Sequence, residues 1–190
     1  MSIRIILQLT LREAARRKVL WGLLILTAVF LGLYALGLNF VHEQIMRSAS
    51  AGRLSRLFSL NDVWNFWMTA TLYASNFLIV MMAVLTSVDT LAGEITSGTI
   101  QSIAVKPLRR LDVLLGKWLG YAVMLGGYTL ALVGGVLLVT TLITGYAPRN
   151  IPTALGLMIL EALVMLSVSL LGGTRLSTLA NGVVGFGLFG

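Results

Sequence analysis

Several kinds of residue are scarce or absent in this sequence. Its 190 residues include no cysteine, one histidine and only 11% charged residues, whereas soluble domains usually carry about 25%. Without cysteine there is no disulfide, thiolate metal site or cysteine nucleophile. The single histidine, His42, excludes a metal site built from several histidines. The shortage of charge also excludes a globular surface covered by water.

Apolar residues, in contrast, are abundant. They make up 57% of the chain, and the mean hydropathy is +0.92. So much apolar surface must face lipid, and the sequence therefore predicts an all-α polytopic membrane protein. The net charge of +7 arises from 14 Lys+Arg against 7 Asp+Glu. The basic residues gather at the ends of apolar segments, which indicates membrane orientation, so no nucleic-acid partner is expected.

The hydropathy pattern predicts a single transmembrane domain over residues 1–190. Residues 1–18 place apolar and basic residues on opposite helical faces, as in an amphipathic interfacial elbow helix. A signal peptide is the rival interpretation, but the apolar run that follows exceeds the roughly 7–15 residues of such a signal. Four complete spans are expected, then a fifth segment too short to cross the hydrocarbon core. The predicted spans are about 19–40, 63–88, 118–144 and 153–173, with the partial one at 179–190.

The loops between these spans differ in charge. Inner segments hold ten basic residues, five before the first span, four in residues 89–117 and Arg175, and outer segments hold four. This difference predicts a cytoplasmic N-terminus. The membrane is expected to be a prokaryotic cytoplasmic (inner) membrane. On the outer side, residues 41–61 are predicted to form a short interfacial helix.

A few polar or small residues stand out inside the spans. Glu161 is the only acid well inside them, and a carboxylate at mid-bilayer costs roughly 2.5–3.5 kcal/mol on insertion scales. Glu161 is expected to face the bundle or a cavity, where it binds a cation, senses a proton or bonds to a helix; Asn76 leaves similar alternatives open. The pairs Gly126-Gly127 and Gly134-Gly135 predict close helix packing. Other polar residues of the second span, expected to face helices or a cavity, are Asn65, Thr69, Thr71 and Ser75.

The inner segment at 89–117 is the most informative part of the sequence. Gly98 weakens a helix and Pro107 ends one, so short helical pieces on the membrane surface are expected. Such pieces are stiff enough to transmit a push, and their polar faces can dock a soluble partner. The residues that mark the pattern are Glu94, Gly98, Thr99, Lys106, Pro107, Arg109, Arg110, Gly116 and Lys117.

The sequence AGEITSGTIQSIAVKPLRRLDVLLGKWLG in this segment resembles permease subunits of ABC transporters of the ABC-type-2 family. The N-terminal QLTLREAARRKVLWGLLIL is similar to the elbow helix that enters the first span of that family. The resemblance implies an exporter subunit that forms the translocation path, pairs with a second permease subunit and couples to a separate ATP-binding subunit. That family usually has six spans, so the chain is expected to be truncated at its C-terminus. The coupling residues that the resemblance implies are Glu94, Gly98, Thr99, Pro107, Arg109, Arg110 and Lys117.

The residues also indicate that ATP is hydrolysed elsewhere. A phosphate loop needs Gly, four residues, Gly-Lys and then Ser or Thr. Here Gly116-Lys117 is the only Gly-Lys pair; Leu111 stands at the position of the first glycine and Trp118 at that of the hydroxyl. This chain is therefore expected to have no catalytic site and to bind no cofactor or metal, with ATP-Mg used by the partner subunit.

Alternatives remain open at this point. Glu94 has a second interpretation as a solvated acid or a helix cap, and Arg109, Arg110 and Lys117 as anchors at lipid headgroups. For the whole chain, the other interpretations are a non-ABC membrane scaffold or assembly factor and an ion-coupled carrier that uses Glu161.

Overall fold

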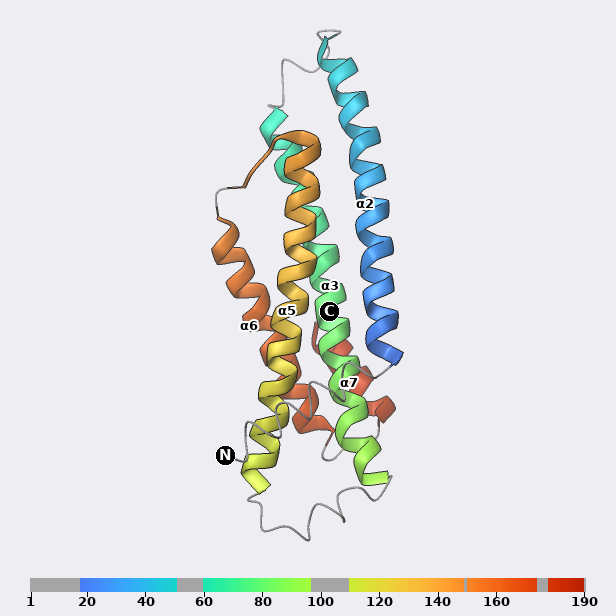
Figure 1. Ribbon diagram of the computed structural model, residues 1–190, viewed down its shortest axis with the longest axis vertical. Coiled ribbons are helices and arrows are strands. Elements are labelled where there is room, and N and C mark those ends of the chain that lie inside the picture. The colour runs from blue at the N-terminus through green and yellow to red at the C-terminus, as the bar shows by residue number, and fades with distance from the viewer. Residues whose placement is uncertain (1–17, 51–59, 97–109, 149, 174–177, 190) are drawn as a thin grey trace.

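The computed structural model describes residues 18–50, 60–96, 110–148, 150–173 and 178–189. Within these ranges, four long helices run up and down along a common axis, and a short helix lies against the lower half of the bundle (Figure 1). The all-α membrane fold is thereby confirmed. The helices are α2 (Lys18–Ser50), α3 (Leu60–Thr96), α5 (Arg110–Thr144), α6 (Ile151–Gly172) and α7 (Thr178–Phe189).

The four long helices each contain an apolar stretch long enough to cross a membrane. These stretches overlap the four complete spans expected from the sequence, and α7, with 12 residues, corresponds to the predicted partial segment. The predicted interfacial helix at 1–18 lies outside the described residues except for Lys18. The membrane-length stretches are Trp21–Arg47, Leu60–Thr86, Leu114–Thr144 and Ile151–Gly172.

Several helices extend further than hydropathy indicates. α2 continues to Ser50 through residues that were expected to start a separate interfacial helix. No Gly or Pro interrupts this part of α2, and Arg47 Nη2 lies 3.2 Å from Glu43 Oε2, an (i, i+4) ion pair that supports helix. At the inner side, α3 continues to Thr96 and α5 begins at Arg110, so residues 89–96 and 110–117 of the inner segment are helical.

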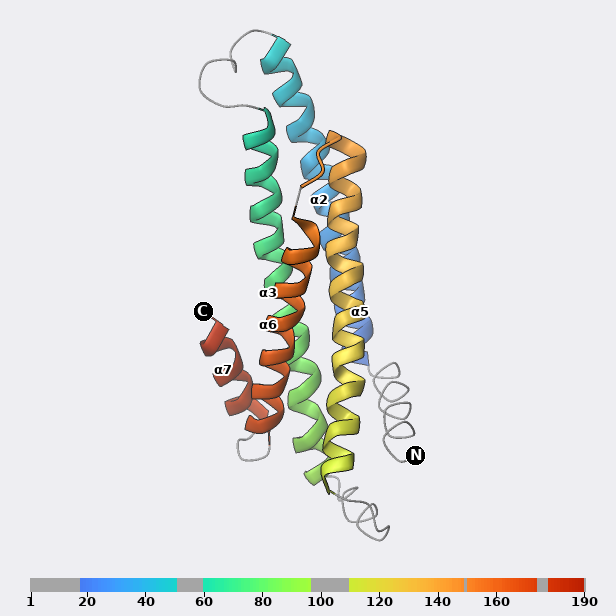
Figure 2. The same cartoon turned by 90° about the vertical axis from the view of Figure 1, so that its left-hand side faces the viewer.

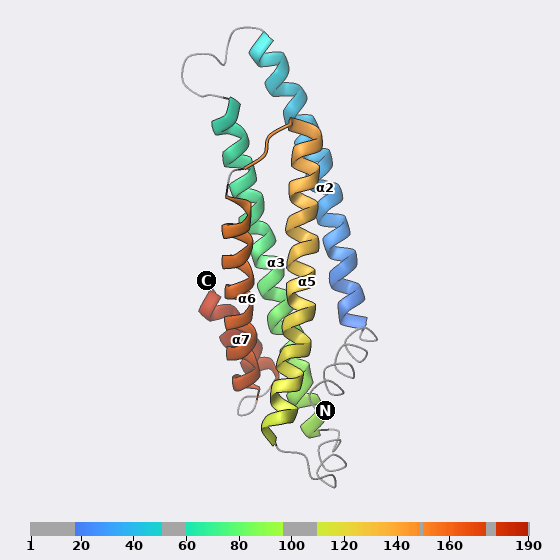
Figure 3. The same ribbon diagram turned by 60° about the vertical axis from the view of Figure 1, so that its left-hand side comes forward.

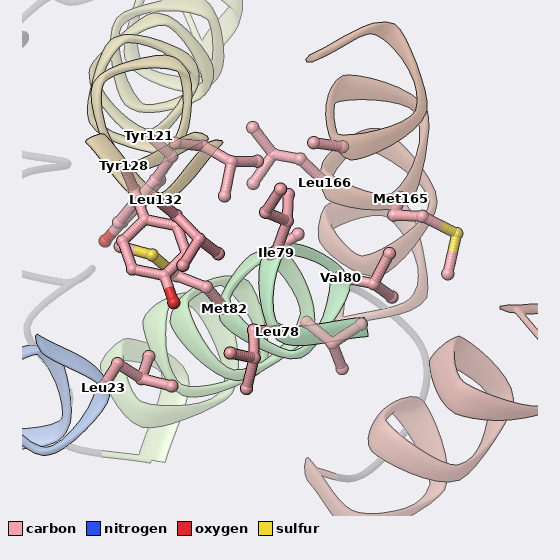
Figure 4. Packing of buried hydrophobic residues seen from close by; sticks show 14 of the residues in the cluster. Leu23, Leu78, Ile79, Val80, Met82, Tyr121, Tyr128, Leu132, Met165 and Leu166 are labelled. Carbon is pink, nitrogen blue, oxygen red and sulfur yellow. The ribbon is translucent and has the colours of Figure 1, made fainter. Parts of the chain in front are cut away.

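α3 is the central helix of the bundle and packs against α2, α5, α6 and α7. Its lower half supplies side chains with no exposed surface, such as Ile79 and Val84, which meet Leu132 of α5 and Leu166 of α6 in one apolar cluster. Figure 4 shows this cluster between the three helices. Because lipid tails are as apolar as these side chains, the helices are held together by close packing rather than by exclusion of water.

α2 joins the bundle mainly through α5, which Figure 2 shows running parallel to it. Leu31 of α2 packs directly on Gly135, where an added Cβ would lie 2.8 Å from Leu31 Cδ1. The prediction of close packing at the glycine pairs is thus confirmed at Gly135. It is wrong for the other three glycines, since an added Cβ at each of them meets nothing within 4 Å among the described residues.

Hydroxyl pairs flank this contact on both sides. The Thr27 and Tyr128 hydroxyls are 2.7 Å apart, and the Tyr34 hydroxyl lies 2.8 Å from Thr140 Oγ1. Both pairs connect α2 to α5. On α2, Thr27 and Tyr34 lie four and three positions from Leu31, so one face of α2 carries both the apolar contact and the hydrogen bonds.

A buried asparagine connects α6 to α7. Asn181 Nδ2 donates to the Ser169 carbonyl oxygen at 2.7 Å, and the Asn181 side chain lies over Gly172, where a Cβ would collide with it. α7 also packs on α3, because Gly185 admits Val84 at 3.0 Å from its ideal Cβ position. The absence of side chains at these two glycines therefore sets the position of α7.

The outward face of α2 between Trp21 and Phe40 is mainly apolar, with Asn39 as its exposed polar residue. Its exposed side chains include Leu33, Leu36 and Phe40, which are 65%, 71% and 64% exposed. Toward the inner end, Trp21 and Ile25 continue the same surface. In a membrane such a face is solvated by lipid tails.

Candidate functional site

The outward face of α3 carries polar side chains. Asp62, Asn65, Thr69, Tyr73 and Asn76 are spaced by three or four residues and fall within an arc of about 80° at 3.6 residues per turn. Asn65 and Thr69 are exposed, and Tyr73 is 76% exposed. We call these five residues the polar stripe. It occupies the upper half of α3, where a helix surrounded by lipid would present apolar groups.

The opposite face of α3 is buried, and its polar groups satisfy themselves locally. The Thr71 hydroxyl donates to the Trp67 carbonyl oxygen at 2.8 Å, and the Ser75 hydroxyl donates to the Thr71 carbonyl oxygen at 2.8 Å. Such back-bonds let hydroxyls lie inside a helix bundle at little cost. The polar residues of this span therefore separate into a buried group and the exposed polar stripe, a division that composition alone does not reveal.

The polar stripe ends at a contact between α3 and α6. Asn76 Nδ2 lies 2.9 Å from Glu161 Oε2, and both residues are half-buried. Figure 3 shows the two helices side by side at mid-height of the bundle. The structure thus brings together the two intramembrane residues that the sequence marked separately, and Glu161 bonds to a neighbouring helix as one of its expected alternatives.

One atom of this pair is left without a partner. Among the described residues, Asn76 Oδ1 is buried and accepts no hydrogen bond. Most buried amide oxygens in proteins are paired, so an unpaired one beside the Glu161 carboxylate is a notable feature of the site.

The predicted coupling residues are only partly within the described structure. Glu94 lies in the last turn of α3, and Arg110 is the first residue of α5. The remaining ones, apart from Lys117, fall outside the described residues: Gly98, Thr99, Pro107 and Arg109.

Lys117, predicted at the inner end of the third span as a coupling residue or a headgroup anchor, is buried in the structure. It lies two turns inside α5, and only 8% of it is exposed. Gly116 is buried beside it in the same continuous helix. A Gly-Lys pair inside a helix cannot wrap around a phosphate, because its backbone N–H groups are already directed along the helix axis.

Sequence reasoning missed several contacts that fix the site. Trp118 Nε1 donates to Ser167 Oγ at 2.9 Å and sets the register of α5 against α6. Asn181 on Ser169 likewise joins α7 to α6. A tryptophan or asparagine in an apolar span signals that a partner exists, but the sequence does not say which residue it is.

Comparison with known families adds one result. The model of a family described as ABC-2 family transporter protein matches residues 4–186, which is nearly the whole chain. A search of curated proteins finds no match.

Proposed function

The chain belongs to the ABC-2 family of transporter proteins, and from this premise we propose that it is the permease subunit of an ATP-driven exporter, coupled to a separate ATP-binding subunit. Permeases of this family are integral membrane components and generally lack catalysis of their own. In the proposed complex the partner subunit binds and hydrolyses ATP-Mg, a second permease subunit completes the assembly, and the N-terminus is cytoplasmic.

The observation that carries the proposal beyond family membership is the polar stripe. Exposed polar groups on a membrane helix avoid lipid and face water, substrate or another subunit. The polar stripe extends from the outer end of α3 down to Asn76, beside Glu161. We place the translocation path along this face, with the second permease subunit on its far side.

Coupling to the ATPase follows from the continuity of α3. The helix has 37 residues and so extends about 55 Å, well beyond the roughly 30 Å of the hydrocarbon core. Its membrane-length stretch ends at Thr86, and the remaining turns continue to Thr96, with Glu94 in the last turn. A push on the inner end of α3 is therefore transmitted to the polar stripe through one uninterrupted helix.

The test is Glu94→Ala in the chain reconstituted with its ATP-binding subunit. If Glu94 pairs with a basic residue of that subunit, the substitution should lower association and stimulated ATP turnover several-fold, as expected for loss of a charge-assisted contact of about 1–2 kcal/mol. Turnover is measured in proteoliposomes and association by copurification.

A matched control is Glu43→Ala. Glu43 is also a helical acid, but it lies at the opposite end of the bundle in an exposed ion pair with Arg47. We expect this variant to retain association and turnover. Unchanged association, turnover and transport in Glu94→Ala would refute the coupling role. Failure of any ATP-binding protein to copurify with the wild-type chain would favour a membrane scaffold instead.

A further inference from the structure

Three exposed aromatic side chains lie on or beside the polar stripe of α3. Phe66, Tyr73 and Phe77 are 70%, 76% and 45% exposed. At 3.6 residues per turn their positions fall within an arc of about 40°, which adjoins the arc of the polar stripe and shares Tyr73 with it. Figure 2 shows the upper half of α3 at the edge of the bundle, where these side chains can meet a molecule from outside the chain. The proposed path is therefore lined by aromatic rings as well as by amide and hydroxyl groups.

The charged residues of α3 and of the two helices that follow α5 are all of one sign. α3, α6 and α7 together contain four acids and no lysine, arginine or histidine, although the whole chain has 14 basic residues against 7 acidic ones. The four acids are Asp62, Asp89, Glu94 and Glu161. The basic residues of the described helices belong instead to α2 and α5. A negatively charged substrate that moves along α3 would thus meet no basic side chain of these three helices, and a charge taken out of water needs a partner.

An organic cation fits both features of this face. The face of an aromatic ring carries negative charge density, so it attracts a cation placed over it and repels an anion. The side-chain oxygens of Asn65 and Thr69 can accept hydrogen bonds from an ammonium group. The rings and these neutral oxygens supply the attraction, so it does not require Glu161 to be ionised. A cation with apolar substituents would also cover the rings, in keeping with ligand sites that are mostly apolar and contain a few polar groups.

We propose that the substrate is a hydrophobic organic cation, such as an ammonium ion with apolar substituents, and that it binds along α3 against Tyr73 and Phe66. The proposal rests on the placement of the translocation path along the polar stripe. Tyr73 is the central contact, because it is the most exposed of the three rings and lies about one turn from both Thr69 and Asn76.

Two ions of similar shape and opposite charge test the proposal. Tetraphenylphosphonium is a permanent cation and tetraphenylborate is its anionic counterpart, so the charge of neither depends on pH. Binding of each ion to the full chain in a neutral detergent is measured by equilibrium dialysis, with protein-free micelles as the blank. We expect saturable binding of the cation, with an affinity at least about tenfold higher than that of the anion. Equal affinities, tighter binding of the anion or no saturable binding of either ion would overturn the proposal.

Substitutions at Tyr73 separate the aromatic face of this side chain from its size. Tyr73→Phe keeps the face and should bind the cation with wild-type affinity. Tyr73→Leu keeps an apolar contact but loses the face, so it should weaken binding about fivefold. Leu36→Ala, on the exposed apolar surface of α2, is the control and should bind as the wild type does. If Tyr73→Leu binds the cation as tightly as the wild type, the ring is not the binding site and the proposal fails.

Labelling of a single cysteine distinguishes the substrate class from the path on which it rests. Thr69→Cys should react with a water-soluble thiol reagent, and tetraphenylphosphonium should slow this reaction several-fold while tetraphenylborate should not. Fast labelling without protection by the cation would leave the path in place and overturn the substrate class. Slow labelling in the absence of both ions would refute the path and the substrate class together. None of these measurements needs ATP or the ATP-binding subunit, so they stand apart from the test of coupling.

Discussion

The outward faces of α2 and α3 are both exposed along the bundle, but they differ in polarity. On α2 the exposed residues between Trp21 and Phe40 are mainly apolar, with Asn39 as the polar exception, whereas α3 exposes Asn65, Thr69 and Tyr73 beside the apolar Phe66. In water both would count simply as surface. In a membrane the first is lipid-facing, and the second indicates contact with water, substrate or a second subunit.

The comparison also shows what holds each helix in place. α2 packs mainly on α5 through Leu31 against Gly135 and the two hydroxyl pairs. α3 instead contacts every other described helix and supplies the buried centre of the bundle. An edge helix with a lipid face and a central helix with a polar face are suited to different tasks: α2 borders the membrane, and α3 borders the proposed path.

Charge insertion should give the largest difference between the two faces. Leu33→Arg places a guanidinium toward lipid near mid-membrane and should cost about 2.5–3.5 kcal/mol on insertion scales. Thr69→Arg on the polar stripe should cost much less, because that face is not solvated by lipid. The yield of folded protein and its unfolding temperature in detergent measure both. Equal losses in the two variants would show that the polar stripe faces lipid after all.

Access of water should give the next largest difference. The chain has no cysteine, so single cysteines report on one site without background. A membrane-impermeant thiol reagent attacks the thiolate, which forms only where water reaches. Cysteine at position 69 or 73 should react at least about tenfold faster than cysteine at position 33 or 36. Labelling rates in sealed vesicles provide the measurement, and equal slow rates at all four positions would contradict a wet path along α3.

Deletion of one hydroxyl of α5 at its contact with α2 should give the smallest effect. Tyr128→Phe removes the bond to Thr27 without changing packing volume. Hydrogen bonds between membrane helices contribute about 0.6 kcal/mol on average and rarely exceed about 1.7. We therefore expect a small drop in unfolding temperature, with Tyr146→Phe, outside the bundle core, as the control. A loss above about 3 kcal/mol would mean that α2 depends on this bond far more than membrane hydrogen bonds usually allow.

Sequence patterns predicted those parts of the fold that depend on local composition. Hydropathy located the four spans, because apolar length is set by the thickness of the bilayer. It did not predict how far α2 and α3 continue beyond the membrane, since residues such as Glu43 and Arg47 form helix well without being apolar. Helix length and membrane span are separate properties of these segments.

The sequence identified residues that make contacts between helices, but it did not identify their partners. Asn76 and Glu161 were each marked as polar residues in an apolar setting, but their pairing depends on the register of α3 against α6. That register depends on the packing of side chains such as Ile79 and Leu166, which no local pattern encodes. Four predicted coupling residues lie outside the described ranges and stay predictions: Gly98, Thr99, Pro107 and Arg109. Lys117 shows that a basic residue near a span can lie within the bundle.

The uninterrupted α3 has a geometric consequence when its contact with α6 is regarded as a pivot. Asn76 divides the helix into an outer arm of about 24 Å and an inner arm of about 30 Å. No proline occurs in α3, and Gly93 near its inner end is its only glycine, so the two arms turn together. A tilt of about 5° about this pivot moves the inner end by about 2.6 Å and the outer end by about 2 Å in the opposite direction. One rotation of α3 could then close the proposed path on one side of the membrane and open it on the other.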